Sequence, residues 1–273
     1  MQYALAYQLN GTQTSGLDVD AKAYINTIVS AGATVTSTQR NAINTFYKLA
    51  KSGGFYALIK RFYLPIWGIA APNAVDLITA TSGTFVGGVT HGAGFIQGNG
   101  STGYFNLLAS PQGVGMVPGS SLTFALVYQA QNAFNALLAT QPTSNRYQGI
   151  IRGSATTMQM NAGLNAAANV TDNNGVGIYI ESEIATNSRY LRRRTTSAGS
   201  VSLVTNTTTP SGVYASFNIN ALCGQSTAGT RYGFSSAQTG GFGVGLAMTT
   251  TQADAFTLAY KTLWETCTGL VLP

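Results

Sequence analysis

The sequence predicts a mainly β protein, an antiparallel β-sandwich or barrel with helices near both ends. Three observations predict this. Short runs of apolar, β-branched and aromatic residues recur between about residues 66 and 249. Turn signals such as Asn173-Asn174-Gly175 separate these runs, and no helical pattern lies between them, which excludes a βαβ fold. The 273 residues include 32 glycines and only 8% charged residues, against about 25% charged in an average soluble protein.

Eight of these runs are expected as strands. They cover residues 84–86, 94–96, 122–128, 147–152, 177–180, 201–204, 212–219 and 242–248. Each run is short, as is typical of strands joined by tight turns. The same composition excludes a disordered chain, which needs low hydrophobicity, and a coiled coil, which needs abundant Glu, Lys and Leu.

The first residues alternate between apolar and other side chains. The apolar positions are Tyr3, Leu5, Tyr7 and Leu9, and Asn10-Gly11 follows them. A period of two predicts a strand with one buried face. Such a strand can belong to the domain's own sheet or add to a neighbouring subunit. We expect residues 1–17 to form an N-terminal strand that acts as a docking arm.

Residues 18–65 change to a helical period and are expected as a helical appendage. Asp18 or Asp20 can cap a first helix that ends at Gly32. Thr36 or Ser37 can cap a second helix, which Gly53-Gly54 ends. Its apolar face carries Ile43, Phe46, Tyr47 and Ala50. Residues 55–61 are expected as a third short helix.

The chain returns to helix after the β region. Thr251 and Asp254 fit a capping box, and Gly269 ends the helix. Its apolar stripe contains Phe256, Ala259, Tyr260, Leu263, Trp264 and Cys267. Residues 66–273 are therefore expected as one β-sandwich that ends in a helix.

Charge and cysteine content restrict the function classes. The net charge of +6 is thinly spread, and Arg192-Arg193-Arg194 is the only basic run, so a basic strand surface is favoured over nucleic-acid binding. Cys223 and Cys267 match no disulfide framework or zinc spacing, which favours two buried thiols over one disulfide. We expect no signal peptide and no membrane insertion, because no basic and apolar leader and no apolar run of about 18 residues is present.

Four segments resemble bacteriophage virion structural proteins with a concanavalin A-like (LamG-like) jelly-roll domain, which occur in tail fibres, tail-associated proteins and other appendages. The segments are residues 23–32, 37–68, 91–106 and 241–264. The most specific piece is Gly98-Asn99-Gly100-Ser101-Thr102 followed by Tyr104. The run 242–248 that enters the helix near Thr251 comes next. The resemblance covers about residues 18–264 and implies a two-sheet sandwich in a virion or adhesion setting.

The chain has eight acidic residues, and two of them form a candidate catalytic pair. Glu181 and Glu183 stand two apart on a predicted strand, so both carboxylates point to one side. Retaining glycosidases hold two carboxylates about 5–5.5 Å apart. The acidic triplet of jelly-roll glycosidases, E-x-D-x-x-E, is incomplete here because the middle residue is Glu183 and position 186 is a threonine. An exposed strand face is favoured, and a glycan hydrolase that uses this pair remains an alternative.

The other polar candidates match ordinary loops better than sites. His91 is the only histidine, so no multi-histidine metal site can form, and no G-x-S-x-G elbow accompanies it. Asp172 brings a single carboxylate to its turn, which is too few for calcium. The glycine-rich stretch 112–116 lacks the Lys-Ser/Thr of a phosphate loop. We therefore expect no catalytic residue, no metal and no cofactor.

Aromatic residues are the remaining candidates for binding. Sugar sites stack an aromatic ring on a sugar face, with polar side chains nearby. The candidates beside polar residues near strand ends are Tyr147, Tyr190, Tyr214 and Tyr232, although packing within the sheet is an alternative for each.

These observations lead to one expected function and two rivals. We expect a non-enzymatic bacteriophage virion protein that is exposed on a tail or fibre appendage and binds a host-surface glycan. Its partners would be other virion proteins and copies of itself, for example in a trimer. The rivals are a capsid or tail decoration protein with a purely structural role, and the glycan hydrolase described above.

Overall fold

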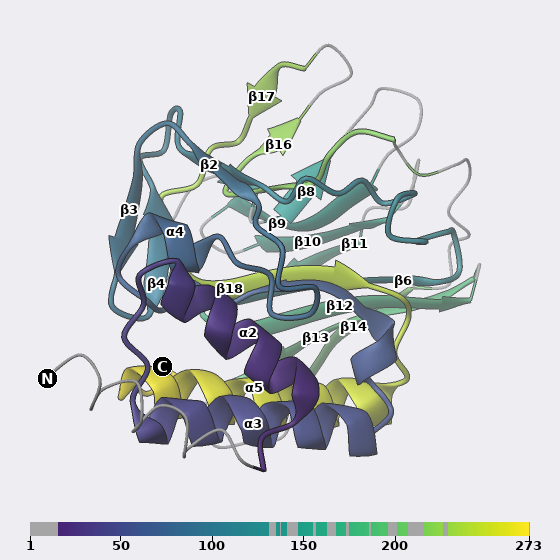
Figure 1. Ribbon diagram of the computed structural model, residues 1–273. Helices are drawn as coiled ribbons and strands as arrows, with labels where there is room; N and C mark the ends of the chain where they lie inside the picture. The colour runs from purple at the N-terminus through teal and green to yellow at the C-terminus, as the bar shows by residue number, and fades with distance from the viewer. Residues whose placement is uncertain are drawn as a thin grey trace, which may run out of the picture.

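The computed structural model describes residues 16–130, 135–136, 138–140, 147–154, 157–162, 168–172, 175–185, 187–195, 201–206, 214, 216–225 and 229–272. It is mainly β, with antiparallel sheets and a few helices, which confirms the coarse fold class. Figure 1 shows three layers, with one sheet between the other sheet and a layer of helices. The predicted strand of residues 2–9 lies outside the described residues.

The first sheet is the middle layer. Its strand order is β14 (Val201–Asn206), β13 (Ser188–Arg194), β12 (Gly177–Ala185), β6 (Ser121–Gln129), β18 (Gln238–Gly245), β4 (Phe95–Gly98) and β3 (Val89–Gly92). A further strand, β1 (Ile59–Tyr63), pairs with β18. All of these pairs are antiparallel.

The second sheet faces the first. Its order is β11 (Ala168–Thr171), β10 (Thr157–Ala162), β9 (Tyr147–Ser154), β8 (Leu138–Thr140), β15 (Asn220–Ala221), β5 (Tyr104–Asn106) and β2 (Thr84–Val86), with β7 (Asn135–Ala136) beside β9. A separate two-stranded ribbon joins β16 (Gly224–Gln225) to β17 (Arg231–Tyr232).

Strand alternation divides the buried residues into two cores. Along β6, Ala125 and Val127 face the second sheet, while Phe124 and Leu126 join the core beneath the helices. Because the first sheet is covered on both faces, β6 and the first part of β12, residues 177–180, are nearly continuous apolar runs. This double burial explains why the runs around residues 122–128 and 177–180 are recognisable in the sequence.

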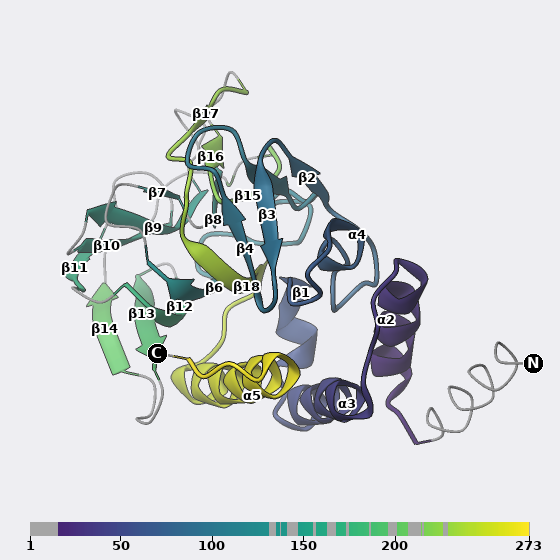
Figure 2. The ribbon, with the colours of Figure 1, turned by 90° about the vertical axis from the view of Figure 1, so that its left-hand side faces the viewer.

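Three helices cover the outer face of the first sheet. They are α2 (Val19–Ser30), α3 (Ser37–Ser52) and α5 (Thr250–Thr268), and Figure 2 shows α3 and α5 side by side. Gln39 at the start of α3 donates through Nε2 to the Cys267 carbonyl near the end of α5, at 2.9 Å. Gln252 near the start of α5 donates to the Gly54 carbonyl just past α3, at 3.3 Å. The two helices therefore run antiparallel.

The helix ends agree with the predicted caps except at α5. Asp18 caps α2, and Thr36 with Gln39 forms a capping box at α3. The α5 box uses Thr249 and Gln252, not Thr251 and Asp254, so this helix begins earlier than predicted. Gly269 closes α5 in the left-handed conformation, as expected.

The predicted helical appendage is a layer of the same body. The segment 55–61, expected as a helix, has only the short 3-10 turn η1 (Tyr56–Leu58) before β1 begins. Because β1 pairs with β18, and Phe62 packs in the same core as α2, α3 and α5, residues 18–65 are joined to the sandwich. The short helix α4 (Ala70–Asn73) follows.

Several strands were not predicted from the sequence. The strands β3, β5 and β10 were not expected, because they are short or carry mostly polar residues. The run 212–219 is wrong as a strand over its described part, since Tyr214 and residues 216–219 belong to no strand and β15 begins at Asn220.

A glycine in β18 makes close packing of two neighbouring strands possible. A Cβ atom on Gly243 would lie 2.1 Å from the Arg61 carbonyl oxygen of β1 and 2.3 Å from the Phe124 ring of β6. We expect Gly243→Ala to lower the free energy of unfolding by about 2–3 kcal/mol, because neither strand can move away without breaking its ladder.

Urea denaturation would measure this loss. Gly113→Ala is the matched control, because the nearest atom to its new Cβ would be the flexible hydroxyl of Ser110, at 3.0 Å, and the backbone atoms of Ser110 would lie at ordinary contact distances of 3.5 and 3.8 Å. Equal stabilities for Gly243→Ala and Gly113→Ala would contradict the packing argument.

Candidate functional site

Glu181 and Glu183 lie side by side on the face of β12 that points to the second sheet. Glu181 stands opposite Thr123 of β6 and Leu191 of β13, and Glu183 stands opposite Ser121 and Arg189. The prediction that they share a face is confirmed. The expectation of an exposed strand face is wrong, because Glu181 is 2% exposed and Glu183 is 0% exposed.

The two carboxylates differ in their hydrogen bonds. One oxygen of Glu183 accepts from the Tyr214 hydroxyl and, at 3.2 Å, from Ser121 Oγ. Both oxygens of Glu181 are buried without a hydrogen-bond partner. Burial raises the pKa of Glu181 to about 8, although the charge of the neighbouring Arg189 lowers it. Burial raises the pKa of Glu183 as well, against the hydrogen bonds that it accepts.

These carboxylates do not form an open pair for hydrolysis. A general acid or nucleophile has to reach its substrate within hydrogen-bond distance. Both groups are closed off between the sheets, so the glycan hydrolase that would use them lacks an entrance in this conformation. Polar residues surround the two buried carboxylates: Thr123 and Ser121 of β6 and Arg189 of β13 stand opposite them at this end of the sheet.

The four candidate tyrosines do not form a common surface. Tyr190 is 4% exposed and donates to the Met248 carbonyl at 2.6 Å, which ties β13 to the start of α5. Tyr214 is 2% exposed and is bound to Glu183. Neither ring is available to stack on a sugar in this conformation. Tyr232 is half-buried and covers Gly224 in the small ribbon. Tyr147 belongs to β9, but its side chain lies outside the described residues.

His91 and Asp172 each have a structural partner. His91 in β3 lies with Nδ1 3.1 Å from Asn73 Nδ2 and packs edge-on against Phe85. Burial lowers its pKa. Asp172 accepts hydrogen bonds from Tyr179 and Arg193, so its carboxylate is bound within the fold. Within the described ranges, no group of three or more His, Cys, Asp or Glu side chains could hold a metal ion.

The cysteines and the basic run also have internal roles. Cys223 and Cys267 are free, buried thiols, which confirms the favoured interpretation. Alternation along β13 sends Arg192 and Arg194 toward α5, where both approach Asp254, and sends Arg193 to Asp172. The basic run is therefore used for packing and is not a free basic surface. No helix in the described part of the chain is long and apolar enough to cross a membrane.

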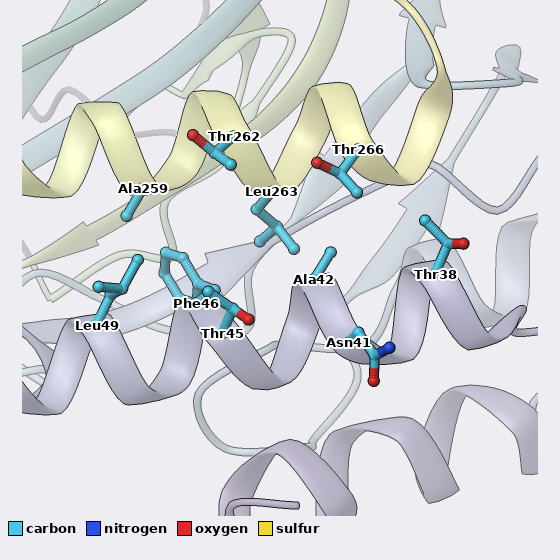
Figure 3. Close-up of a pocket in the computed structure, with 10 residues that line it drawn as sticks. All are labelled: Thr38, Asn41, Ala42, Thr45, Phe46, Leu49, Ala259, Thr262, Leu263 and Thr266. Atoms are coloured by element: carbon cyan, nitrogen blue, oxygen red, sulfur yellow. The ribbon is translucent and has the colours of Figure 1, made fainter. Parts of the chain in front are cut away.

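Open hollows lie at two places in the described structure that differ in chemistry. The first, which we name the α3–α5 groove, is made of two adjoining hollows of about 320 and 430 Å³ that share Leu49, Ala259 and Thr262. Figure 3 shows the α3 and α5 side chains that line the first hollow. Its lining is Thr38, Asn41, Ala42, Thr45, Phe46, Leu49, Ala259, Thr262, Leu263 and Thr266.

The second surface is a cavity of about 610 Å³ beside β1, which we name the basic cavity. Tyr56, Lys60 and Arg61 line one side, and the glycine-rich stretch 113–115 lines another. Arg61 is anchored by Asp76, whose Oδ2 lies 3.5 Å from Arg61 Nε. Asp76 is itself buried and accepts from Phe62 N and Ile78 N, both at 2.9 Å. The sequence patterns missed this cavity because its residues come from segments far apart in the chain.

No protein family model and no curated protein matches the chain. Among solved structures, it is similar to domain 4 of AbnA, a GH43 extracellular arabinanase from Geobacillus stearothermophilus, in complex with arabinotriose. The identity is 10% over 74% of this chain and 98% of that domain, with a TM-score of 0.49. A Trypanosoma rangeli sialidase in complex with sialic acid is 11% identical over 80% of this chain, with a TM-score of 0.45.

The chain spans only 38% of the length of that sialidase chain. The prediction that the chain is not an enzyme is corrected, because these similar structures come from an arabinanase and a sialidase.

Proposed function

We propose that the chain is a structural protein of a bacteriophage particle, built on a concanavalin A-like jelly roll and exposed on a tail or fibre appendage. One observation carries this proposal. The four segments that resemble such proteins meet in space: α2 and α5 both pack on α3, β1 pairs with β18, and Trp264 of α5 donates to the Gly94 carbonyl. A resemblance that covers one contiguous packed unit supports kinship of the whole architecture better than scattered matches would.

Immunogold labelling of intact particles tests this proposal. An antibody against the purified chain should label tail or fibre tips under the electron microscope. Label spread over the capsid would support decoration instead, and hundreds of copies per particle would agree with that outcome. If no particle is labelled by an antibody that recognises the purified chain, the virion proposal is wrong.

We propose further that the particle contacts a host-surface glycan through the basic cavity. Its lining combines an aromatic residue, Tyr56, with the two hydrogen-bond donors Lys60 and Arg61. Cations in a shallow cavity favour a glycan that carries carboxylate or sulfate groups, since charge-assisted hydrogen bonds are the stronger ones. This cavity replaces the buried Tyr190 and Tyr214 as the candidate sugar contact.

Lys60→Glu is expected to weaken binding to acidic glycans on an array by about tenfold or more, because it replaces an attractive charge by a repulsive one. Lys48→Glu is the matched control, since it makes the same charge change on an exposed position of α3 outside the cavity. Equal binding by both variants would exclude the basic cavity as the glycan site.

A further inference from the structure

His91 lies where three parts of the fold meet. It belongs to β3, the edge strand of the first sheet, and stands opposite Ile96 of β4. Its ring packs edge-on against Phe85 of β2, the edge strand of the second sheet, with 4.5 Å between the ring centroids. Its Nδ1 lies 3.1 Å from Nδ2 of Asn73, the last residue of α4. A change in the state of His91 therefore acts on both sheet edges and on α4.

The side-chain amide of Asn73 has a fixed orientation. Asn73 is 0% exposed, and its Oδ1 accepts a hydrogen bond from the Trp67 N–H at 2.8 Å. A backbone N–H can only donate, so the amide oxygen has to face Trp67 and the NH₂ group has to face His91. Turning the amide over would place two donors against each other at Trp67 and would lose a buried hydrogen bond.

This orientation decides which ring nitrogen of His91 carries the proton. The NH₂ group of Asn73 only donates, so Nδ1 of His91 has to accept, and the single ring proton of the neutral imidazole is on Nε2. A doubly protonated ring carries an N–H at both nitrogens. Its Nδ1–H would face the Asn73 NH₂ group, donor against donor. Proton uptake by His91 is therefore incompatible with the hydrogen bond to Asn73.

No charged group of the contacting elements compensates for a proton on His91. The strands β2, β3 and β4 and the helix α4 contain no Asp, Glu, Lys or Arg. Asp76, the acidic residue nearest to Asn73 along the chain, is paired with Arg61. Burial lowers the pKa of His91 below its ordinary value of 6.5. His91 is therefore neutral at pH 7.

The bond to Asn73 continues a chain of hydrogen bonds that reaches the helical layer. Trp67, whose N–H holds Asn73, donates through Nε1 to the Tyr24 hydroxyl of α2 at 3.3 Å. Helix α2 packs in turn on α3 and α4. Because β3 pairs with a single strand, β4, in the described structure, the contact with Asn73 contributes to holding this edge strand in place.

We propose that His91 and Asn73 form an acid-sensitive latch between the edge strand β3 and helix α4. In neutral solution the latch is closed. When His91 takes up a proton, Nδ1 no longer accepts, the hydrogen bond to Asn73 breaks, and β3 is released from α4. Released His91 binds a proton more readily than latched His91, so falling pH favours the released state. This inference does not rest on glycan binding or on a place in a phage particle.

Nuclear magnetic resonance on the untagged full chain tests the closed state. His91 is the only histidine, so the imidazole signals belong to it alone. At pH 7 the nitrogen shifts should show the proton on Nε2 and the lone pair on Nδ1, and the ring should titrate with a midpoint below pH 6.5. A proton on Nδ1 at pH 7, or a midpoint at or above pH 6.5, would overturn the latch.

The variant Asn73→Asp identifies the group that excludes the proton. One carboxylate oxygen can still accept from the Trp67 N–H, and the other can now accept from a protonated Nδ1 of His91. The midpoint of His91 should therefore rise above pH 6.5 in this variant. An unchanged midpoint would show that Asn73 does not control the protonation of His91, and the proposal would be wrong.

Hydrogen exchange tests the release of β3. Protection of the β3 amides, corrected for intrinsic exchange, should fall by about tenfold between one pH unit above and one below the measured midpoint, because a buried hydrogen bond is lost. His91→Asn is the matched variant, since its Oδ1 is attached to Cγ as Nδ1 is, can accept from Asn73 and takes up no proton. Its β3 amides should show no such fall. An equal pH response in both proteins would overturn the latch.

Discussion

Replacing Glu181 with glutamine is expected to stabilise the protein at alkaline pH and to remove much of its pH dependence. The folded protein keeps the proton of this buried carboxyl up to its pKa of about 8, while the unfolded chain releases it near the ordinary value of 4.5. Between these pH values the unfolded state binds fewer protons than the folded state, so stability falls as pH rises. The loss is absent below about pH 4.5 and complete above about pH 8.

The expected size is large because the carboxylate has no hydrogen-bond partner. Each pH unit between the two pKa values corresponds to about 1.4 kcal/mol, so Glu181→Gln should gain about 3–5 kcal/mol at pH 8.5 and little at pH 4.5. Urea unfolding at both pH values measures this difference. Glu183 also contributes to the pH dependence of the parent protein, and a comparison with the variant isolates the part that Glu181 contributes.

Glu265→Gln is the matched control, because Glu265 pairs with Lys261 at the surface of α5 and is not enclosed between sheets. Its effect should be within about 1 kcal/mol at either pH. An unchanged pH slope in Glu181→Gln would contradict the burial of an unpartnered carboxyl group.

The second large effect is expected at Trp264, which connects α5 to the first sheet. Its ring is 0% exposed, and its Nε1 donates to the Gly94 carbonyl at 2.8 Å. A Cβ on Gly240 would lie 2.5 Å from that same Nε1, so the indole lies directly on β18. Trp264→Ala should lower the free energy of unfolding by about 3–5 kcal/mol, since it leaves a cavity and an unpaired carbonyl.

Leu258→Ala provides the comparison on the same helix. Leu258 is 53% exposed, so its replacement should change the free energy of unfolding by less than about 1 kcal/mol. Denaturation monitored by circular dichroism would compare the two variants. Similar losses in both would mean that α5 is not anchored to the sheet through Trp264.

Local signals in the sequence were sufficient for much of the fold. Apolar stripes and capping residues predicted α2, α3 and α5, because a helix that covers a sheet needs one apolar face. The strands β6, β12 and β18 were recognisable because burial on two faces demands apolar runs. The basic run was expected as a basic strand surface, and it does lie in strand β13, but its arginines are bound by Asp254 and Asp172, which lie far away in the sequence.

The candidate site was less predictable. Alternation correctly placed Glu181 and Glu183 on one face of β12, but a period of two does not tell which of two opposed faces is open to solvent. Tyr190 and Tyr214 stand beside polar residues in the sequence, yet both are buried, because their hydroxyls bind Met248 and Glu183. The basic cavity could not be predicted from the sequence, because Tyr56, Lys60 and the stretch 113–115 come together only after folding.

The sequence by itself determined the class of the fold, the positions of the three large helices and the buried state of both thiols. Each of these follows from the period or type of neighbouring residues, which local physics governs. The tertiary structure alone decided that residues 18–65 are part of the sandwich, that the carboxylate pair is enclosed, and that a groove lies between α3 and α5. These depend on contacts between segments up to about 200 residues apart, and a local pattern carries no information about which distant surface will cover it.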